Sequence, residues 1–224
     1  MSFNEVNRIE DKVQIRNVIV SVFDKKELDS MLIALLRYCP GVRFYATGGT
    51  FAHIEAMLGE RAGAHLVSMA LYTGQPEMKG GLVKTLDWKI YLGLLAEPFD
   101  EEHKADLLQH HAVAFDMVIG NLYPFEDAAL NARSFEAARQ HIDIGGPTLL
   151  RAAAKNFLRV CPVPSPDLYP EIIDALERDN GAVGLAERRH MAEEVFTRQS
   201  EYDAAIGRYL SGQKEEVAKS YKII

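Results

Sequence analysis

The chain has 224 residues, of which 48% are hydrophobic and 25% are charged, a composition typical of a globular protein with a buried core. Its formal net charge of -7 argues against general nucleic-acid binding, which depends on a basic face. No apolar run approaches the ~20 residues of a membrane span, and the polar first residues do not resemble a signal peptide. We therefore expect a cytoplasmic protein that binds neither nucleic acid nor membranes.

Three short apolar segments near the start of the chain predict β-strands, at residues 17–23, 42–46 and 64–68. Asp24, with Glu27 three residues later, is typical of a capping box, and apolar side chains at helical spacing predict a helix after it. A second helix is expected at residues 51–57. This order of strands and helices indicates a parallel sheet with helices on its faces.

The rest of the chain continues the pattern. Residues 72–85 are rich in glycine and polar side chains, so we expect a long functional loop there. Residues 115–122 and 159–163 predict two more buried strands. Helical or mixed structure is expected at residues 88–96, and helices are expected at residues 101–111, 134–140, 147–156, 165–178 and 185–210. The last dozen residues are polar and are expected to fray.

The chain contains only two cysteines, Cys39 and Cys161. Two cysteines are too few for a disulfide framework and do not form a metal-binding spacing, so we expect both to be buried thiols. The seven histidines form no pair with metal-ligand spacing. The sequence therefore predicts no metal site.

Four segments follow predicted strands, and ligands of open α/β sheets gather at the carboxyl ends of the strands. In the first, Lys25 could reach a phosphate, although a solvated lysine in a first helical turn would look the same. In the second, residues 47–50 read Thr-Gly-Gly-Thr before a helix, which suits anion binding but also an ordinary turn. For each of these two segments, the residues alone leave both interpretations open.

The third and fourth segments carry further polar groups. Lys84 and Thr85 could supply a charge and a hydroxyl, or could belong to a flexible surface loop. Asp143 opens a turn before a helix that ends near Lys155. Because the alanines before Lys155 suggest close packing, we expect this lysine to be partly desolvated and able to transfer protons near neutrality. The alternative is a lysine that complements the carboxyl end of the helix.

Several motifs of this chain also occur, in the same order, in one family. The chain resembles the N-terminal IMP cyclohydrolase domain of the bifunctional purine-biosynthesis protein (AICAR transformylase/IMP cyclohydrolase). The matching segments are residues 47–50, 72–74, 76–78, 83–86, 121–125, 142–156 and 201–206. The resemblance covers about residues 16–210, which we expect to form one domain between polar termini at residues 1–15 and 211–224. Because the chain stops where the transformylase domain of the family would begin, we expect a stand-alone domain.

The resemblance implies a methylglyoxal-synthase-like fold, which is a Rossmann-type parallel sheet with helices on both faces. It implies closure of the ring of 5-formamidoimidazole-4-carboxamide ribonucleotide (FAICAR) to IMP and water, without metal or cofactor. It also implies a homodimer and a separate AICAR transformylase as partners. Implied catalytic residues are Lys155, Asp143, Lys84, Tyr123 and Asn121. Implied substrate-binding residues are Phe23, Asp24, Lys25, Thr47, Gly48, Gly49, Thr50, Leu82, Val83, Lys84, Thr85, Asn121, Leu122, Asp143, Ile144 and Gly145.

The chain departs from the family pattern on the ligand side. Leu82 stands where the family has an arginine, and Phe23 stands where it has a serine. Leucine cannot replace the phosphate contact of an arginine, which is worth about 1.5–3 kcal/mol. Two other hypotheses therefore stay open: a non-catalytic nucleotide-binding or regulatory module of the same fold, and a phospho-sugar lyase similar to methylglyoxal synthase.

Overall fold

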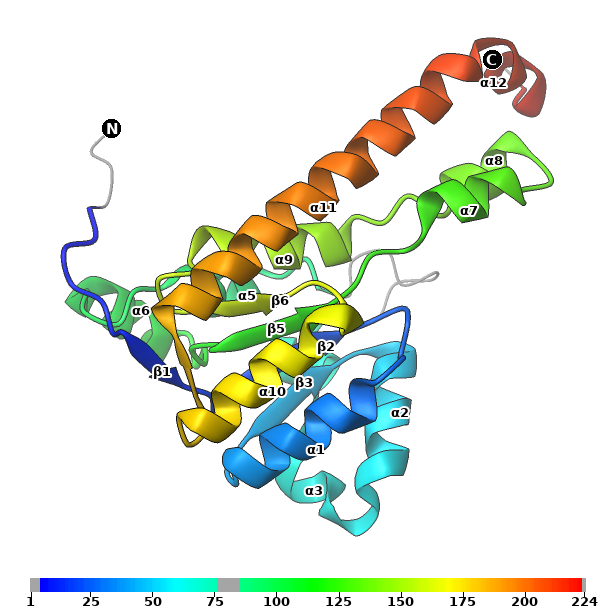
Figure 1. The fold of residues 1–224 in the computed structure, drawn as a ribbon. Coiled ribbons are helices and arrows are strands. Elements are labelled where there is room, and N and C mark those ends of the chain that lie inside the picture. Colours follow the sequence, from blue (N-terminus) through cyan, green and yellow to red (C-terminus); the bar gives the residue numbers. More distant parts are fainter. Residues whose placement is uncertain (1–4, 76–84, 223–224) are drawn as a thin grey trace.

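A five-stranded parallel sheet forms the centre of the molecule (Figure 1). The structure is a computed structural model that describes residues 5–75 and 85–222. The strand order is β4-β3-β2-β5-β6, and the central strand β2 pairs in parallel with β3 on one side and β5 on the other. The strands are β2 (Asn17–Ser21), β3 (Arg43–Ala46), β4 (Leu66–Ser68), β5 (Met117–Gly120) and β6 (Cys161–Val163). The predicted α/β fold class is therefore confirmed.

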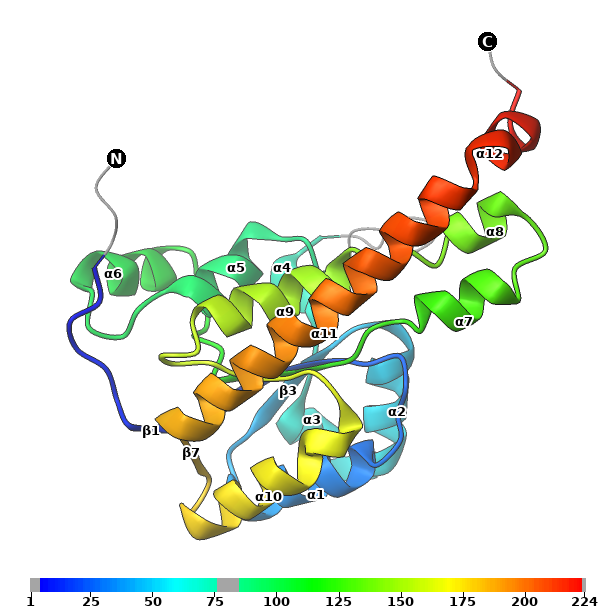
Figure 2. The same ribbon diagram turned by 45° about the horizontal axis from the view of Figure 1, so that its top comes forward.

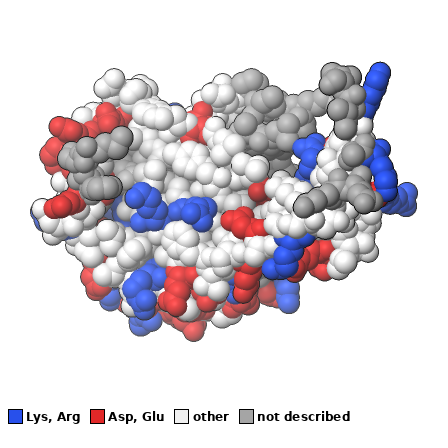
Figure 3. Space-filling view, turned by 90° about the horizontal axis from the view of Figure 1, so that it is seen from above, with Lys and Arg blue, Asp and Glu red and all other residues white. Residues whose placement is uncertain are grey.

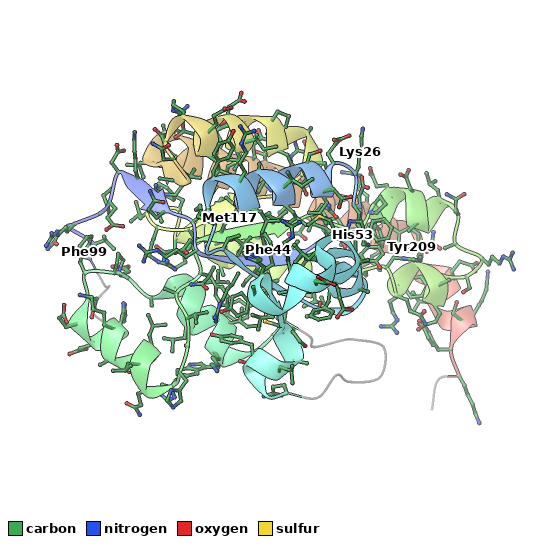
Figure 4. The ribbon with its side chains drawn as sticks, turned by 90° about the horizontal axis from the view of Figure 1, so that it is seen from below. Lys26, Phe44, His53, Phe99, Met117 and Tyr209 are labelled. Atoms are coloured by element: carbon green, nitrogen blue, oxygen red, sulfur yellow. The ribbon has the colours of Figure 1, made fainter. Side chains whose placement is uncertain are left out.

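Helices cover both faces of the sheet because successive strand residues point to opposite sides. Val18 and Val20 of β2 face one core cluster, and Ile19 between them faces the other. The first cluster includes Phe44 and Met117, both labelled in Figure 4. It packs against α1 (Leu28–Tyr38), α2 (Gly48–Leu58) and α10 (Tyr169–Arg178). The second packs against α5 (Trp88–Leu95), α9 (Gly145–Lys155) and α11 (Leu185–Gly212).

A small second sheet fixes the start of the chain, which the sequence does not predict. β1 (Lys12–Gln14) pairs antiparallel with β7 (Ala182–Gly184). Arg188, which is fully buried, donates hydrogen bonds to the main-chain oxygens of Glu10 and Asp11 and to three more. The other three acceptors are the main-chain oxygens of Phe157, Leu158 and Val183. One guanidinium thus joins three separate segments of the chain.

The helix boundaries differ from the predictions at several points. Residues 64–65 end α3 (Ala62–His65), and residues 72–73 end α4 (Met69–Thr73), so neither pair belongs to the predicted strand or loop. Glu27 precedes α1 with φ of 55° and without a side-chain cap, so the predicted capping box is wrong. The Asp24 carboxylate accepts a hydrogen bond from the Lys26 N–H at 2.9 Å instead. The remaining helices are η1 (Gly59–Arg61), α6 (Glu101–Gln109), α7 (Phe125–Leu130), α8 (Phe135–Arg139), η3 (Pro166–Leu168) and α12 (Lys214–Ser220).

The second half of α11 extends beyond the sheet with α7, α8 and α12 beside it (Figures 1 and 2). Aromatic contacts hold this extension together: Tyr209 of α11 lies 5.5 Å from Phe125 and 6.1 Å from Phe135, measured between ring centroids. The sequence predicts α8 but neither α7 nor α12. Within residues 5–75 and 85–222, we find no helix with both the length and the apolar character needed to cross a membrane.

Both cysteines are buried and free, as predicted. Burial raises the pKa of the Cys39 thiol to about 11 and that of Cys161 to about 12. The face shown in Figure 3 carries small, separate groups of basic side chains among acidic and neutral ones. In the part of the chain that the structure describes, no three histidine, cysteine, aspartate or glutamate side chains gather closely enough to hold a metal ion.

Candidate functional site

The strand order identifies the end of the sheet at which a ligand would bind. The chain leaves β2 toward β3 on one side and later returns to β5 on the other side, so the β2–β5 boundary is a switch point. Ligands of open α/β sheets bind outside the carboxyl ends of the strands at such a point. Lys26 and His53, labelled in Figure 4, mark this end of the molecule, and Phe99 lies at the opposite end.

Two neighbouring cavities lie at the switch point. The first, of about 690 Å³, is lined by the ends of β2 and β5, by the start of α2 and by residues 140–146; we refer to it as the switch-point cavity. The second, of about 940 Å³, lies between residues 121–127 and α11; we refer to it as the α11 cavity. Phe23, Lys25, Asn121 and Tyr123 line both. The predicted segments at residues 23–25, 47–50, 121–123 and 143–145 therefore lie around these two neighbouring cavities.

The amino end of α2 offers uncompensated N–H groups to the switch-point cavity. Thr47 is the N-cap residue, but its side chain caps no N–H group, and the first turn has no acidic side chain. The first N–H groups of a helix lack helical partners and favour anions. Gly48 has φ of 51°, which suits glycine, and a Cβ on Gly49 would meet no atom within 4 Å. The backbone here is open to an anionic ligand group.

Two predicted site side chains, Thr50 and Asn121, line the switch-point cavity and also make hydrogen bonds within the protein. The buried Thr50 hydroxyl donates to the main-chain oxygen of Val22 at 3.1 Å and fastens α2 to the end of β2. The buried Asn121 amide accepts from the N–H groups of Phe23 at 2.7 Å and Asp24 at 3.0 Å. It also donates to the main-chain oxygen of Asp24 at 2.7 Å. Asn121 therefore positions the turn after β2, which the sequence does not reveal.

Asp143 lies at the amino end of α9, half-buried at the edge of the switch-point cavity. Burial raises the pKa of its carboxyl group, and hydrogen bonds from the N–H groups of Gly146, Gly145 and Ile144 oppose that shift. The carboxylate accepts from the Gly146 N–H at 3.3 Å. A carboxylate with a raised pKa is a stronger proton acceptor than an ordinary aspartate.

The long helix α11 positions the Asp143 turn. The hydroxyl oxygen of Tyr202 accepts a hydrogen bond from the Asp143 N–H at 2.8 Å. The Gln199 side chain donates to the main-chain oxygen of Pro147 at 2.9 Å. The sequence does not assign either side chain to the site. The signal that could have found Tyr202 is the motif at residues 201–206.

Comparisons with known proteins show the family of the chain. The model of a family described as "MGS-like domain" matches residues 33–148, which is more than half of the chain. The chain belongs to this MGS-like family. A second model, described as "AICARFT/IMPCHase bienzyme", matches residues 153–223 of the same MGS-like chain.

Two similar proteins are named "Bifunctional purine biosynthesis protein PurH". The protein of Synechococcus sp. (strain CC9605) is 40% identical over 196 residues, which cover 87% of this MGS-like chain and 36% of the relative. The protein of Rhizobium rhizogenes (strain K84 / ATCC BAA-868) is 36% identical over 214 residues, which cover 96% of this chain and 38% of the relative. The chain thus spans little more than a third of these relatives. A solved structure described as "Crystal structure of ForH" is 30% identical, with a TM-score of 0.71, and the match covers 88% of this chain and 99% of that one.

Apart from Lys155, the other predicted site residues line one of the two cavities or lie outside the described residues. Thr85 is buried and lines the switch-point cavity with Ile144 and Gly145. Asp24 and Leu122 line the α11 cavity. Leu82, Val83 and Lys84 lie outside the described residues, as does most of the loop expected at residues 72–85.

Lys155 does not join the other site residues. It ends α9, whose eleven residues rise by about 16 Å, whereas the α9 residues that line the cavities are Gly145, Gly146 and Leu150. Its side chain is exposed, so the prediction that it is desolvated is wrong. The alanines before it are buried, but at position 155 the helix has turned the side chain to solvent. Lys155 therefore lines neither cavity, and its position gives no support to proton transfer there.

Replacement of Gly146 by alanine is expected to displace the Asp143 carboxylate without unfolding the MGS-like domain. A Cβ at position 146 would lie 2.5 Å from Asp143 Oδ2, the far end of a flexible side chain. We expect a change in melting temperature of a few degrees or less and a loss of about tenfold or more in turnover by the reaction proposed below. The matched control is Gly207→Ala on α11, where a Cβ meets no atom within 4 Å. Equal turnover by both variants would contradict the expectation.

Proposed function

We propose that this chain binds a purine-pathway ribonucleotide and acts as an IMP cyclohydrolase, converting FAICAR to IMP and water. The observation that carries the proposal is the convergence on one cavity at the switch point of Phe23, Lys25, Asn121, Tyr123 and residues 47–50 and 143–145. The similarity to relatives named as purine biosynthesis proteins supports the substrate class. A homodimer and a separate AICAR transformylase as partner belong to the same proposal.

The phosphate of the nucleotide would bind at the amino end of α2. The uncapped N–H groups of residues 48–50 and the half-buried Lys25 both border the switch-point cavity. A lysine ammonium binds phosphate as a point charge, and helix N–H groups add directed donors. The amino end of α9 suits the phosphate less well, because Asp143 already places a carboxylate there.

Ring closure needs positioning and proton transfer. The carboxamide nitrogen attacks the formyl carbon and forms a new C–N bond; two hydrogens then leave with the formyl oxygen as water. Because both groups belong to one molecule, holding them face to face supplies much of the rate. Asp143 would accept the proton from the attacking nitrogen, and Tyr123 is a second candidate for proton transfer. Lys84 would stabilise the negative charge that develops on the formyl oxygen.

The test is turnover of FAICAR by the purified chain without added metal or cofactor, followed by the appearance of IMP. Circular dichroism establishes that the protein is folded. IMP formation at a rate proportional to protein concentration supports the proposal. Folded protein that forms no IMP above the uncatalysed background would refute it.

A non-catalytic nucleotide-binding module is the second candidate. It is favoured by Phe23, a large and half-exposed apolar side chain that lies two residues after β2 and lines the proposed nucleotide site. Calorimetric titration with IMP, run beside the turnover assay, separates the two candidates. Binding of IMP without turnover of FAICAR would favour the module, and turnover would exclude it.

A further inference from the structure

Two large aromatic side chains remain exposed at the boundary between the two cavities. Phe23 is 46% exposed and Tyr123 is 39% exposed, although most large apolar side chains of the sheet region are buried. Their ring centroids lie 4.1 Å apart, with the ring planes tilted by 36°. Both residues line the switch-point cavity and the α11 cavity. The pair thus presents aromatic surface to the space in which a ligand would bind.

The two rings meet because their strands are neighbours. Ser21 at the end of β2 pairs with Gly120 at the end of β5, and each aromatic residue follows two or three positions later. The Asn121 amide holds the main chain of Phe23 through the 2.7 Å bond from the Phe23 N–H. The His141 ring lies 6.0 Å from the Tyr123 ring and extends the aromatic surface. The main chain at Phe23 is therefore fixed, and the Phe23 and Tyr123 rings contact each other.

The switch-point cavity has chemically different walls. One wall is the amino end of α2, which favours an anionic group, and another is the pair of aromatic rings. A nucleotide has the same division, with a phosphate on one side of the ribose and a planar heterocycle on the other. Aromatic side chains stack on planar heterocycles, and the strength of stacking depends little on which base is bound. A phosphorylated sugar without a base would leave the aromatic wall unused.

We propose that Phe23 and Tyr123 form a stacking platform for the heterocycle of the bound nucleotide, with Phe23 as a specificity-determining residue. This inference rests on the proposed function and narrows it: the ligand must carry a planar base as well as a phosphate. The Phe23 ring adds stacking surface beside Tyr123 that a small side chain at this position would not supply. The platform thus favours nucleotides over phospho-sugars of equal charge.

The test is calorimetric titration of wild type and Phe23→Ala with IMP and, separately, with ribose 5-phosphate, which lacks the base. We expect Phe23→Ala to weaken IMP binding by about 5- to 140-fold, which corresponds to ~1–3 kcal/mol at 1.4 kcal/mol per tenfold. Binding of ribose 5-phosphate should change by less than about twofold, because the α2 end is untouched. Because the Phe23 side chain is half exposed, the variant should melt within a few degrees of wild type.

Two conservative variants complete the experiment. Phe23→Tyr keeps the ring and should bind IMP within about threefold of wild type. Tyr123→Phe also keeps its ring and should retain IMP affinity, so a loss of turnover in that variant alone would assign proton transfer to the Tyr123 hydroxyl while leaving the platform intact.

The outcomes separate the platform from the proposed function. If wild type binds IMP and Phe23→Ala binds it equally well, the platform is refuted and the proposed function stands. If Phe23→Ala weakens IMP and ribose 5-phosphate by the same factor, the side chain supports the phosphate end and the platform is again refuted. If wild type binds no IMP, both proposals fail.

Discussion

Asp143→Asn is expected to lower the rate of FAICAR ring closure by about 10²–10⁴-fold while the protein remains folded. Asparagine has nearly the same shape and can still accept the hydrogen bond that Gly146 donates to the Asp143 side chain. It cannot accept the proton that the attacking carboxamide nitrogen must lose. The measurement is the turnover number for IMP formation, with the melting temperature recorded for the same preparation.

The pH dependence of stability and of rate, compared between wild type and Asp143→Asn, gives a second readout. Burial raises the pKa of Asp143, so its contribution to stability is fully present below the ordinary aspartate pKa and is lost as pH rises through the raised value. Above that window, at neutral pH, the asparagine variant should be at least as stable as wild type. The acid limb of the wild-type rate profile should lie above the ordinary aspartate pKa, because the ionised carboxylate is the proposed proton acceptor.

The control for this experiment is Asp106→Asn, on the exposed surface of α6 away from both cavities. This variant should keep the wild-type rate and the wild-type pH profile. If Asp143→Asn turns over FAICAR within about threefold of wild type, Asp143 does not carry the proton. A collapse of the melting temperature in Asp143→Asn would show instead that the carboxylate is needed for the fold.

The central sheet could be predicted because its strands are apolar on both faces. A buried parallel strand reads as a short, mostly apolar run, and residues 17–23 and 115–122 have that pattern. The small sheet β1–β7 could not be predicted, because Lys12–Gln14 contains a single apolar side chain and its pairing with Ala182–Gly184 spans most of the chain. α3 also ends inside the predicted strand at residues 64–68, because short apolar segments are ambiguous between helix and strand.

The candidate site was predictable as a set of loops and not as a set of contacts. Strand order alone brings residues 23–25 and 121–123 together, since both segments follow adjacent parallel strands. Whether a polar side chain faces the ligand or the protein depends on partners distant in sequence. Asn121 bonds the turn at residues 23–24, almost a hundred positions earlier, and Tyr202 reaches Asp143 from a helix that begins at residue 185.

Lys155 shows that two residues of one sequence motif can lie far apart in the structure. It belongs to a continuous motif with Asp143, and nearness in sequence suggests nearness in space. A helix separates the two residues instead, because eleven residues of α9 carry the chain from one end of the sheet toward the other. Motif membership therefore identifies a family more reliably than it locates a catalytic side chain.

Arg188→Met is expected to have the largest effect on stability, lowering the free energy of unfolding by about 3–5 kcal/mol. The fully buried guanidinium donates to five main-chain oxygens, and methionine fills similar volume without a donor. Each acceptor that stays buried without a partner costs about 1–3 kcal/mol, although the segment at residues 10–14 can relax into solvent. Chemical denaturation with urea measures the loss, and hydrogen exchange should show earlier opening of β1.

Arg189→Met is the matched control, because Arg189 is the next residue of α11 but points to solvent, where it pairs with Glu193 at 3.5 Å. An exposed ion pair of this kind contributes little, so the control should change the free energy of unfolding by less than about 0.5 kcal/mol. Arg188→Lys separates charge from geometry: one ammonium cannot reach five oxygens in three segments, so we expect it to recover less than half of the loss. Equal stability of the Arg188→Met and Arg189→Met variants would show that the N-terminal segment and β7 hold together without the guanidinium.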